Sequence, residues 1–131
     1  MKNLKRTANS NIDFLGQLTD EDLLSYYQNC QAVIFPTEED FGLVPVEAMA
    51  CGKLIITTNV GGIEDFVENN QNGFLIDDFA EDKFVDIISD IMNNKVDINS
   101  IIKKANEMAI KKFNFNRLRK DIEYLYSSLR K

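Results

Sequence analysis

The chain has 131 residues, of which 44% are hydrophobic, and this is enough for one domain with a core and too short for two. It carries a net charge of −6, no histidine and two cysteines. The composition therefore excludes a disordered tail and, within this chain, a Ser-His-Asp or Cys-His catalytic set. It also argues against a zinc site and against general nucleic-acid binding.

The first third of the chain predicts a strand, a helix and a second strand. Residues 11–16 have the pattern of a short strand that ends at a glycine. Thr19 and Asp22 form a capping-box pattern that predicts a helix over residues 18–30. The apolar run at residues 31–37 is typical of a strand buried on both faces of a parallel sheet. The inner face of the helix would carry Leu23, Tyr27 and Cys30.

The next segment repeats the alternation of helix and strand. Pro45 suits the first turn of a helix, and Gly52 suits its end. Residues 53–59 predict another buried strand. Residues 60–73 predict a glycine turn, a short helix and an Asn-Gly stop, and residues 74–77 a fourth strand.

Helices dominate the rest of the chain. Asp78 and Glu81 form a second capping-box pattern, and the helix after them repeats apolar residues at helical spacing. Residues 98–112 and 114–130 predict two further helices. These repeated apolar residues are Phe84, Ile87, Ile88 and Ile91.

The order of the predicted elements indicates an α/β fold, a Rossmann-like doubly wound parallel sheet. Such sheets often have about six strands, whereas four are predicted here. We predict a single domain over residues 1–131, with an α/β core at 10–97 and C-terminal helices at 98–131. Cys30 and Cys51 both lie in apolar helical contexts, so we expect buried, reduced side chains, with a disulfide or a reactive thiol as the alternatives.

The segment PTEEDFGLVP, residues 36–45, joins a predicted strand to a predicted helix. Ligands of open α/β sheets bind beyond the carboxyl ends of the strands, and the first amides of a helix favour an anion such as phosphate. An acid beside such a site is useful if it faces hydroxyl groups, as in ribose recognition. The segment therefore fits a sugar attached to a nucleoside diphosphate. Alternatively, Glu47 complements the helix dipole and residues 38–40 are a solvated loop.

The residues EDFGLVPVEAMACG resemble the signature of glycosyltransferase family 4, which belongs to the glycosyl transferases group 1. In these retaining enzymes two glutamates separated by seven residues flank a Phe-Gly-Leu loop, as Glu39 and Glu47 do here. The flanking sequences are similar to the family over residues 10–90. The resemblance implies the donor-binding C-terminal half of a GT-B fold.

The resemblance also implies roles for individual residues. Glu39 would be the catalytic residue, in contact with the transferred sugar, and Glu47 would bind the donor ribose. The glycines Gly61 and Gly62 would form the neighbouring turn, although the family often has Pro-Glu where this chain has Glu64-Asp65. Further donor contacts would come from Phe41, Gly42, Leu43 and Val44, and Gly16 and Leu18 would lie beside the nucleobase.

The family implies a UDP- or GDP-sugar donor, a saccharide or lipid-linked acceptor, and no metal. It places an Arg-Lys pair and an acceptor-binding N-terminal domain upstream. We find no such pair before Asn11, so we expect an N-terminally truncated chain that lacks this domain, with a partner chain as one source of it. The alternative to an enzyme part is a non-catalytic nucleotide-sugar-binding module.

Charge and hydropathy give expectations about location. No apolar run approaches the roughly 18 residues of a membrane span, and no signal peptide is expected. The balance of charge is −12 over residues 1–100 and +6 over residues 101–131. The basic end is interpreted as the solvated face of packed helices or, alternatively, as a contact with anionic lipid. We therefore expect a cytoplasmic protein with a peripheral contact at the inner membrane face as one option.

Overall fold

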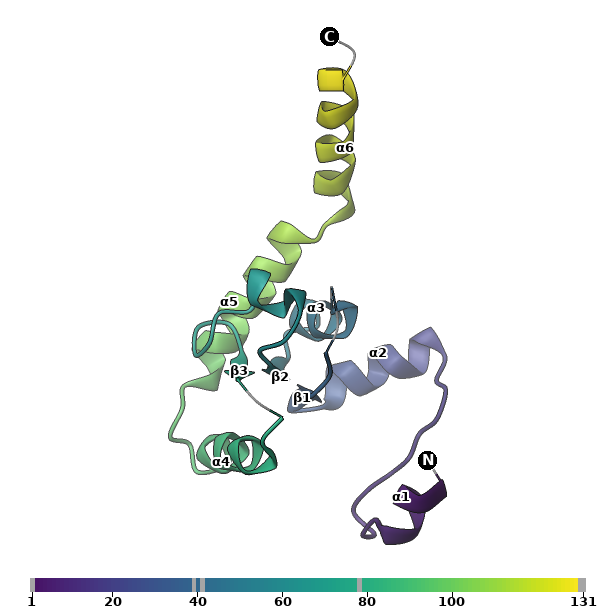
Figure 1. The fold of residues 1–131 in the computed structure, drawn as a ribbon, viewed down its shortest axis with the longest axis vertical. Helices are drawn as coiled ribbons and strands as arrows, with labels where there is room; N and C mark the ends of the chain where they lie inside the picture. Colours follow the sequence, from purple (N-terminus) through teal and green to yellow (C-terminus); the bar gives the residue numbers. More distant parts are fainter. Residues whose placement is uncertain (1, 39, 41, 78, 130–131) are drawn as a thin grey trace.

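The computed structural model of the chain describes residues 2–38, 40, 42–77 and 79–129. Its centre is a parallel three-stranded sheet in the order β1 (Ala32–Phe35), β2 (Leu54–Thr58) and β3 (Phe74–Ile76) (Figure 1). Ala32 pairs with Leu54, and Ile56 pairs with Phe74. The predicted α/β class with a parallel sheet is confirmed.

The central strand β2 is buried along its whole length. Its side chains alternate between two apolar clusters, with Ile55 on one face and Leu54 and Ile56 on the other. Because both faces are covered, the strand reads in the sequence as a continuous apolar run and not as an alternation.

One face of the sheet is covered by α3 (Leu43–Ala50), the 3₁₀ helix η1 (Gly62–Asp65) and α5 (Ile98–Lys112). Their shared core includes Met49, Ile63 and Ala105, all three inaccessible to solvent. Gly52 follows α3 in the left-handed conformation, and the amides of Gly52 and Lys53 donate to carbonyls of the last turn. The end predicted for this helix is therefore confirmed, and it sets the direction of the chain into β2.

The opposite face is covered by α4 (Glu81–Met92). The apolar face predicted for this helix packs on the sheet as expected. The helix begins at Glu81, the second residue of the predicted capping box, and Ala80 is at its N-cap. Asp78 itself lies outside the described residues.

Helix α2 (Asp20–Asn29) precedes β1 and begins as predicted. Thr19 is its N-cap, and the Thr19 hydroxyl accepts a hydrogen bond of 3.2 Å from the Asp22 amide. Of the predicted inner face, Tyr27 is buried, whereas Leu23 is exposed. Cys30 and Cys51 are free, as predicted, but they are half-buried and not fully buried. The disulfide alternative is wrong.

The strand predicted at residues 11–16 does not form. These residues form an irregular segment between α1 (Lys2–Thr7) and α2, and this segment lies apart from the sheet (Figure 1). Ile12, Phe14 and Leu15 are exposed. A strand needs a neighbour that accepts its hydrogen bonds and buries one face, and among the described residues no strand pairs with this segment.

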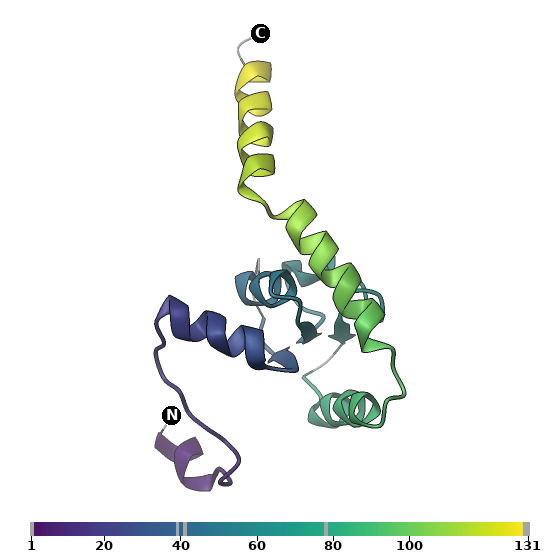
Figure 2. The same cartoon turned by 180° about the vertical axis from the view of Figure 1, so that it is seen from behind.

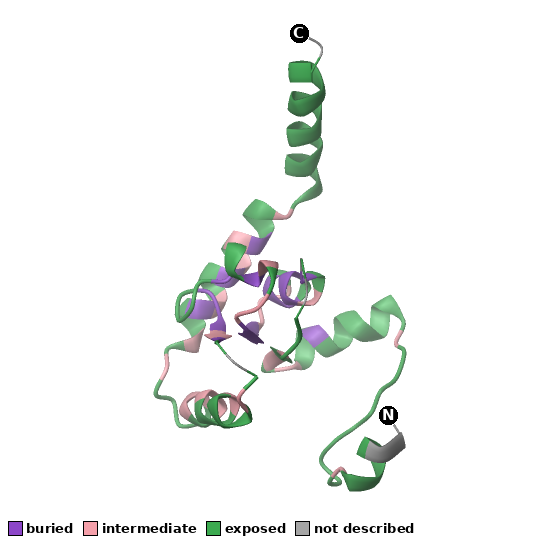
Figure 3. Cartoon of the chain, viewed as in Figure 1, coloured by how far each residue is buried: buried purple, intermediate pink, exposed green. Residues whose placement is uncertain are grey.

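The last helix, α6 (Phe115–Leu129), projects from the end of α5 away from the body of the molecule (Figures 1 and 2). Every described residue of α6 is exposed (Figure 3). Neither this helix nor any other in the described part of the chain is long and apolar enough to cross a membrane. The exposed apolar side chains of α6 are Phe115, Leu118, Ile122, Leu125 and Leu129.

Candidate functional site

The carboxyl ends of β1 and β2 are tied together by two threonine hydroxyls. Thr57 donates to the Phe35 carbonyl at 2.8 Å, and Thr58 donates to the Thr37 carbonyl at 3.3 Å. Both threonines are fully buried. These bonds fix the point at which the chain leaves β1 toward the predicted signature loop.

The ends of β2 and β3 are joined in a similar way. The Asn59 amide nitrogen donates to Asp77 Oδ1 at 3.2 Å, and the Asn59 backbone amide donates to the Ile76 carbonyl at 2.7 Å. All three strand ends therefore lie along one connected edge, the place where open α/β sheets bind ligands.

Gly42 occupies the start of α3 at this edge. It is the N-cap residue, with φ of 72° and ψ of 61°, and it is buried. A Cβ atom at this position would lie 3.3 Å from Cγ1 of Ile63, so the absence of a side chain allows the turn to rest on η1. Glu39 and Phe41, the other two predicted residues of this loop, lie outside the described residues.

The turn at Gly61 and Gly62 adjoins the Gly42 turn through Ile63. Gly61 has φ of 79° and ψ of −148°, a conformation that is open almost only to glycine. Two of the predicted donor-binding segments are thus brought together at the ends of β1 and β2, as the sequence led us to expect.

Glu47 lies one turn beyond the start of α3, and its side chain is exposed on the side that faces α2. The Tyr27 hydroxyl donates a hydrogen bond of 3.1 Å to Glu47 Oε2. Both residues line a hollow of about 300 Å³, together with Asp20, Leu23 and Cys51.

The electrostatics of this pair define which partner donates. Burial first, and then the hydrogen bond and the negative charge of Glu47, raise the pKa of Tyr27 to about 12. The phenol therefore stays protonated over the physiological range, so it is the donor and the carboxylate is the acceptor.

The other residues that are predicted to contact the donor substrate lie around the Gly42 turn and Glu47. Leu43 is 61% exposed and faces a second hollow of about 360 Å³, whose walls include Phe113 and Leu118. Val44 is half-buried. Gly16 has a positive φ of 74° and open space around it, and Leu18 leads into α2, whose Asp20 borders the hollow beside Glu47.

A family comparison decides the class of the protein. The model of the family described as glycosyl transferases group 1 matches residues 2–109. The chain belongs to this family.

Two curated glycosyltransferases are similar to most of the chain. The uncharacterized glycosyltransferase MJ1178 of Methanocaldococcus jannaschii is 29% identical over 92% of the chain and 34% of the relative. The capsular polysaccharide biosynthesis glycosyltransferase CapM of Staphylococcus aureus is 29% identical over 95% of the chain and 33% of the relative. The chain thus spans about a third of the length of these relatives.

Solved structures of similar proteins confirm the predicted fold as the Rossmann-like half of a GT-B protein. Anabaena HepE in complex with UDP-glucose superposes with a TM-score of 0.85 at 28% identity, over 97% of the chain and 35% of that structure. Sucrose-phosphate synthase from Thermosynechococcus elongatus gives a TM-score of 0.84 at 27% identity, over 98% and 33%.

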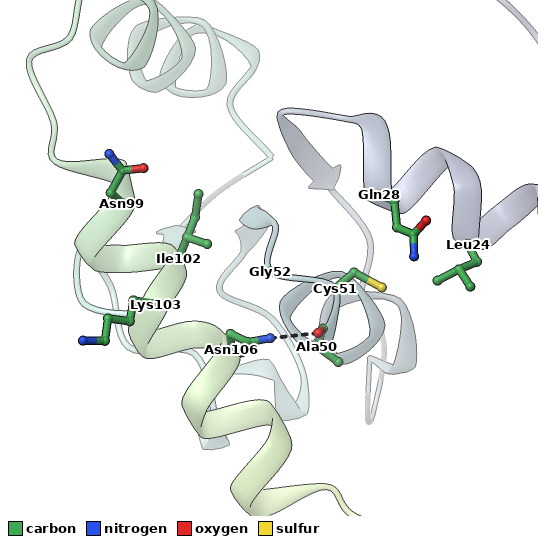
Figure 4. Close-up of a pocket in the computed structure, with 9 residues that line it drawn as sticks. All are labelled: Leu24, Gln28, Ala50, Cys51, Gly52, Asn99, Ile102, Lys103 and Asn106. Carbon is green, nitrogen blue, oxygen red and sulfur yellow. Dashed lines mark hydrogen bonds between the residues drawn. The ribbon is translucent and has the colours of Figure 1, made fainter.

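A further groove of the chain lies away from the signature turn. It has a volume of about 630 Å³ and lies between α2, α5 and the C-terminal end of α3 (Figure 4). Cys51, Gly52 and Asn106 line it, and the Asn106 side chain points toward the Ala50 carbonyl. Since α3 returns from the carboxyl edge of the sheet, this groove lies at the opposite end of that helix from Gly42.

Two residues of the site were not predicted as such. Tyr27 was expected only on an inner helix face, and Ile63 was part of an unspecified short helix. Tyr27 is 20 positions from Glu47, so local spacing gives no signal that the two side chains meet.

Proposed function

We propose that the chain is the donor-binding part of a retaining glycosyltransferase of family 4. It would transfer a sugar from a UDP- or GDP-sugar to a saccharide or lipid-linked acceptor, in the synthesis of cell-surface polysaccharides or other glycans. The observation that carries the proposal is the position of Glu47 one turn after the buried Gly42 N-cap, on the helix that starts at the carboxyl edge of the sheet. The HepE complex with UDP-glucose and the capsule-forming relative CapM support it.

The proposed contacts follow from the chemistry of the groups. Glu47 would accept hydrogen bonds from the two ribose hydroxyls, because a carboxylate offers several lone pairs to a diol. The first amides of α3 would bind the diphosphate, because they lack partners within the helix. The transferred sugar would contact Glu39, the nucleobase would lie near Gly16 and Leu18, and other donor contacts would involve Phe41, Gly42, Leu43, Val44, Gly61 and Gly62.

Transfer requires stabilisation of two charges. The reacting sugar passes through an oxocarbenium-like state, and negative charge develops on the leaving diphosphate. Amide dipoles at the start of α3 would meet part of that charge, and no metal is proposed. We propose that further cations and the acceptor site come from an N-terminal domain, in a longer protein or in a partner chain. The surroundings would be cytoplasmic, and a peripheral contact with the inner membrane face is part of the proposal.

The test is a calorimetric titration of the purified chain with UDP and with GDP. Glu47→Ala should weaken binding of the better-bound nucleotide by about 1.5–3 kcal/mol, because the lost hydrogen bonds involve a charged group. The far-ultraviolet circular dichroism should not change. Glu107→Ala, on the exposed side of α5, is the control with the same change in charge. Equal affinities for the Glu47 and Glu107 variants would refute the ribose role of Glu47.

A further inference from the structure

Tyr27 is the one described side chain that forms a hydrogen bond with Glu47. It belongs to α2, whereas Glu47 belongs to α3, so the bond joins the two helices that border the hollow. Tyr27 is only 8% exposed, and its ring is therefore held in place by packing.

A hydrogen-bond donor fixed in place limits the motion of the Glu47 carboxylate. Its side chain is exposed and has three rotatable bonds, so without a partner the carboxylate samples many positions. A ligand that binds only one of these positions loses affinity in proportion to the time spent in the others. A donor fixed by packing removes that loss before the ligand arrives.

We propose that Tyr27 is a positioning residue for ribose recognition, holding Glu47 Oε2 so that the remaining lone pairs of the carboxylate face the ribose hydroxyls. The inference rests on the proposed ribose role of Glu47. One phenol hydrogen bond occupies one acceptor position of the carboxylate and leaves enough capacity for a diol. Because burial and Glu47 raise the pKa of Tyr27 to about 12, this bond persists throughout the neutral range.

In the alternative case, Tyr27 does not position Glu47, and Glu47 only accepts the hydrogen bond that a buried tyrosine hydroxyl requires. In that case the loss of the Tyr27 hydroxyl would alter stability alone. The two cases are distinguished by comparing the affinity of the Tyr27→Phe variant for a ribonucleotide with its affinity for a nucleotide that has no ribose hydroxyls.

The experiment compares the better-bound of UDP and GDP with its 2′,3′-dideoxy analogue by calorimetry. Tyr27→Phe should weaken binding of the ribonucleotide about 3- to 10-fold, as expected for one ordinary hydrogen bond, and should leave the affinity for the dideoxy analogue unchanged. In a Glu47→Ala background the same substitution should have no further effect. Tyr26→Phe, on the exposed neighbour, is the matched control and should bind both nucleotides like the wild type.

The outcomes separate the two proposals. If Glu47→Ala leaves ribonucleotide binding unchanged, the proposed role of Glu47 is wrong and the role of Tyr27 falls with it. If Glu47→Ala weakens binding while Tyr27→Phe does not, only the positioning role is overturned. An equal loss for both nucleotides in Tyr27→Phe also overturns it. Since both ligands are measured on one protein, any change in folding affects the two affinities alike.

Discussion

Gly42 combines two requirements that only glycine meets at this position. Its backbone is left-handed, and a Cβ would approach Ile63 to 3.3 Å. Gly52 has the same type of backbone, with φ of 68°, but a Cβ there would meet no atom within 4 Å. Comparing the two separates backbone strain from packing.

We predict that Gly52→Ala lowers the free energy of unfolding by about 1–2 kcal/mol, the usual cost of the left-handed conformation. Gly42→Ala should cost more, since Ile63 must also shift. Urea denaturation of the two variants measures both changes. A smaller effect at Gly42 than at Gly52 would show that the turn is loosely packed against η1.

The raised pKa of Tyr27 predicts a fall in stability at alkaline pH. Below pH 10 the phenol is protonated in the folded and in the unfolded state, so the contribution of Tyr27 to the free energy of unfolding is fully present. As the pH rises from about 10 toward 12, the unfolded chain loses this proton while the folded protein retains it, so the free energy of unfolding decreases. Tyr27→Phe removes this contribution.

Urea denaturation at intervals between pH 9 and 12 tests this prediction. The wild type should lose more stability over that range than Tyr27→Phe, and Tyr26→Phe should behave like the wild type because Tyr26 is exposed. Parallel curves for all three proteins would mean that the Tyr27 hydroxyl titrates normally in the folded state.

At the scale of elements, Asn106 connects α5 to the end of α3. Its amide nitrogen donates to the carbonyls of Met49 at 3.1 Å and Ala50 at 2.8 Å. We predict that Asn106→Ala lowers the free energy of unfolding by about 1–2 kcal/mol, because two ordinary hydrogen bonds are lost. Asn99→Ala, on the rim of the same groove, should have little effect (Figure 4). Thermal or chemical denaturation that does not distinguish the two variants would contradict the prediction.

The elements that the sequence predicts correctly are those with local signals. Helix α4 is visible through its apolar repeat, α2 through Thr19 and Asp22, and β2 through its unbroken apolar run. The segment at residues 11–16 has an equally good local pattern, yet it forms no strand. Pairing depends on a distant neighbour, and that information is absent from a window of six residues.

In the candidate site, too, features with a local sequence signal are predicted and features that depend on tertiary packing are not. The αL turn at Gly42 and the adjoining turn at Gly61 follow from motif residues whose position after a strand is a local property. The bond between Tyr27 and Glu47 follows from the way that α2 packs beside α3, and neither helix encodes it alone. The predicted inner face of α2 did place Tyr27 toward the core, which is as far as periodicity reaches.

At the scale of the whole molecule, α6 adds apolar surface without adding core. None of its described residues is buried. We predict that removing residues 115–131 changes the free energy of unfolding by no more than about 0.5 kcal/mol, as for ordinary surface changes. Removing residues 98–131 should unfold the chain, because Ala105 and Ala109 of α5 belong to the core. A large loss of stability from the shorter deletion would show that α6 packs on the body in solution.

The proposed function predicts what this chain does by itself. We expect it to bind a nucleotide but not to transfer sugar, because holding donor and acceptor together contributes up to roughly 7–11 kcal/mol in favourable cases and the chain spans about a third of its relatives. The assay is release of nucleoside diphosphate from UDP- and GDP-sugars with saccharide and lipid acceptors. A longer protein or partner that includes the N-terminal domain should restore turnover. Repeated turnover by the chain alone, abolished by Glu39→Ala, would contradict this expectation.

The bare start of α3 has a consequence for amide hydrogen exchange. Gly42 supplies no side-chain cap, and Pro45 has no amide proton, so the amides of Leu43 and Val44 are the ones of the first helical turn that lack a carbonyl partner within the helix. The last turn is closed by bonds from Cys51, Gly52 and Lys53. In deuterated water one short helix should therefore exchange quickly at its first turn and slowly at its last. A bound diphosphate would protect the first turn and make the two ends alike.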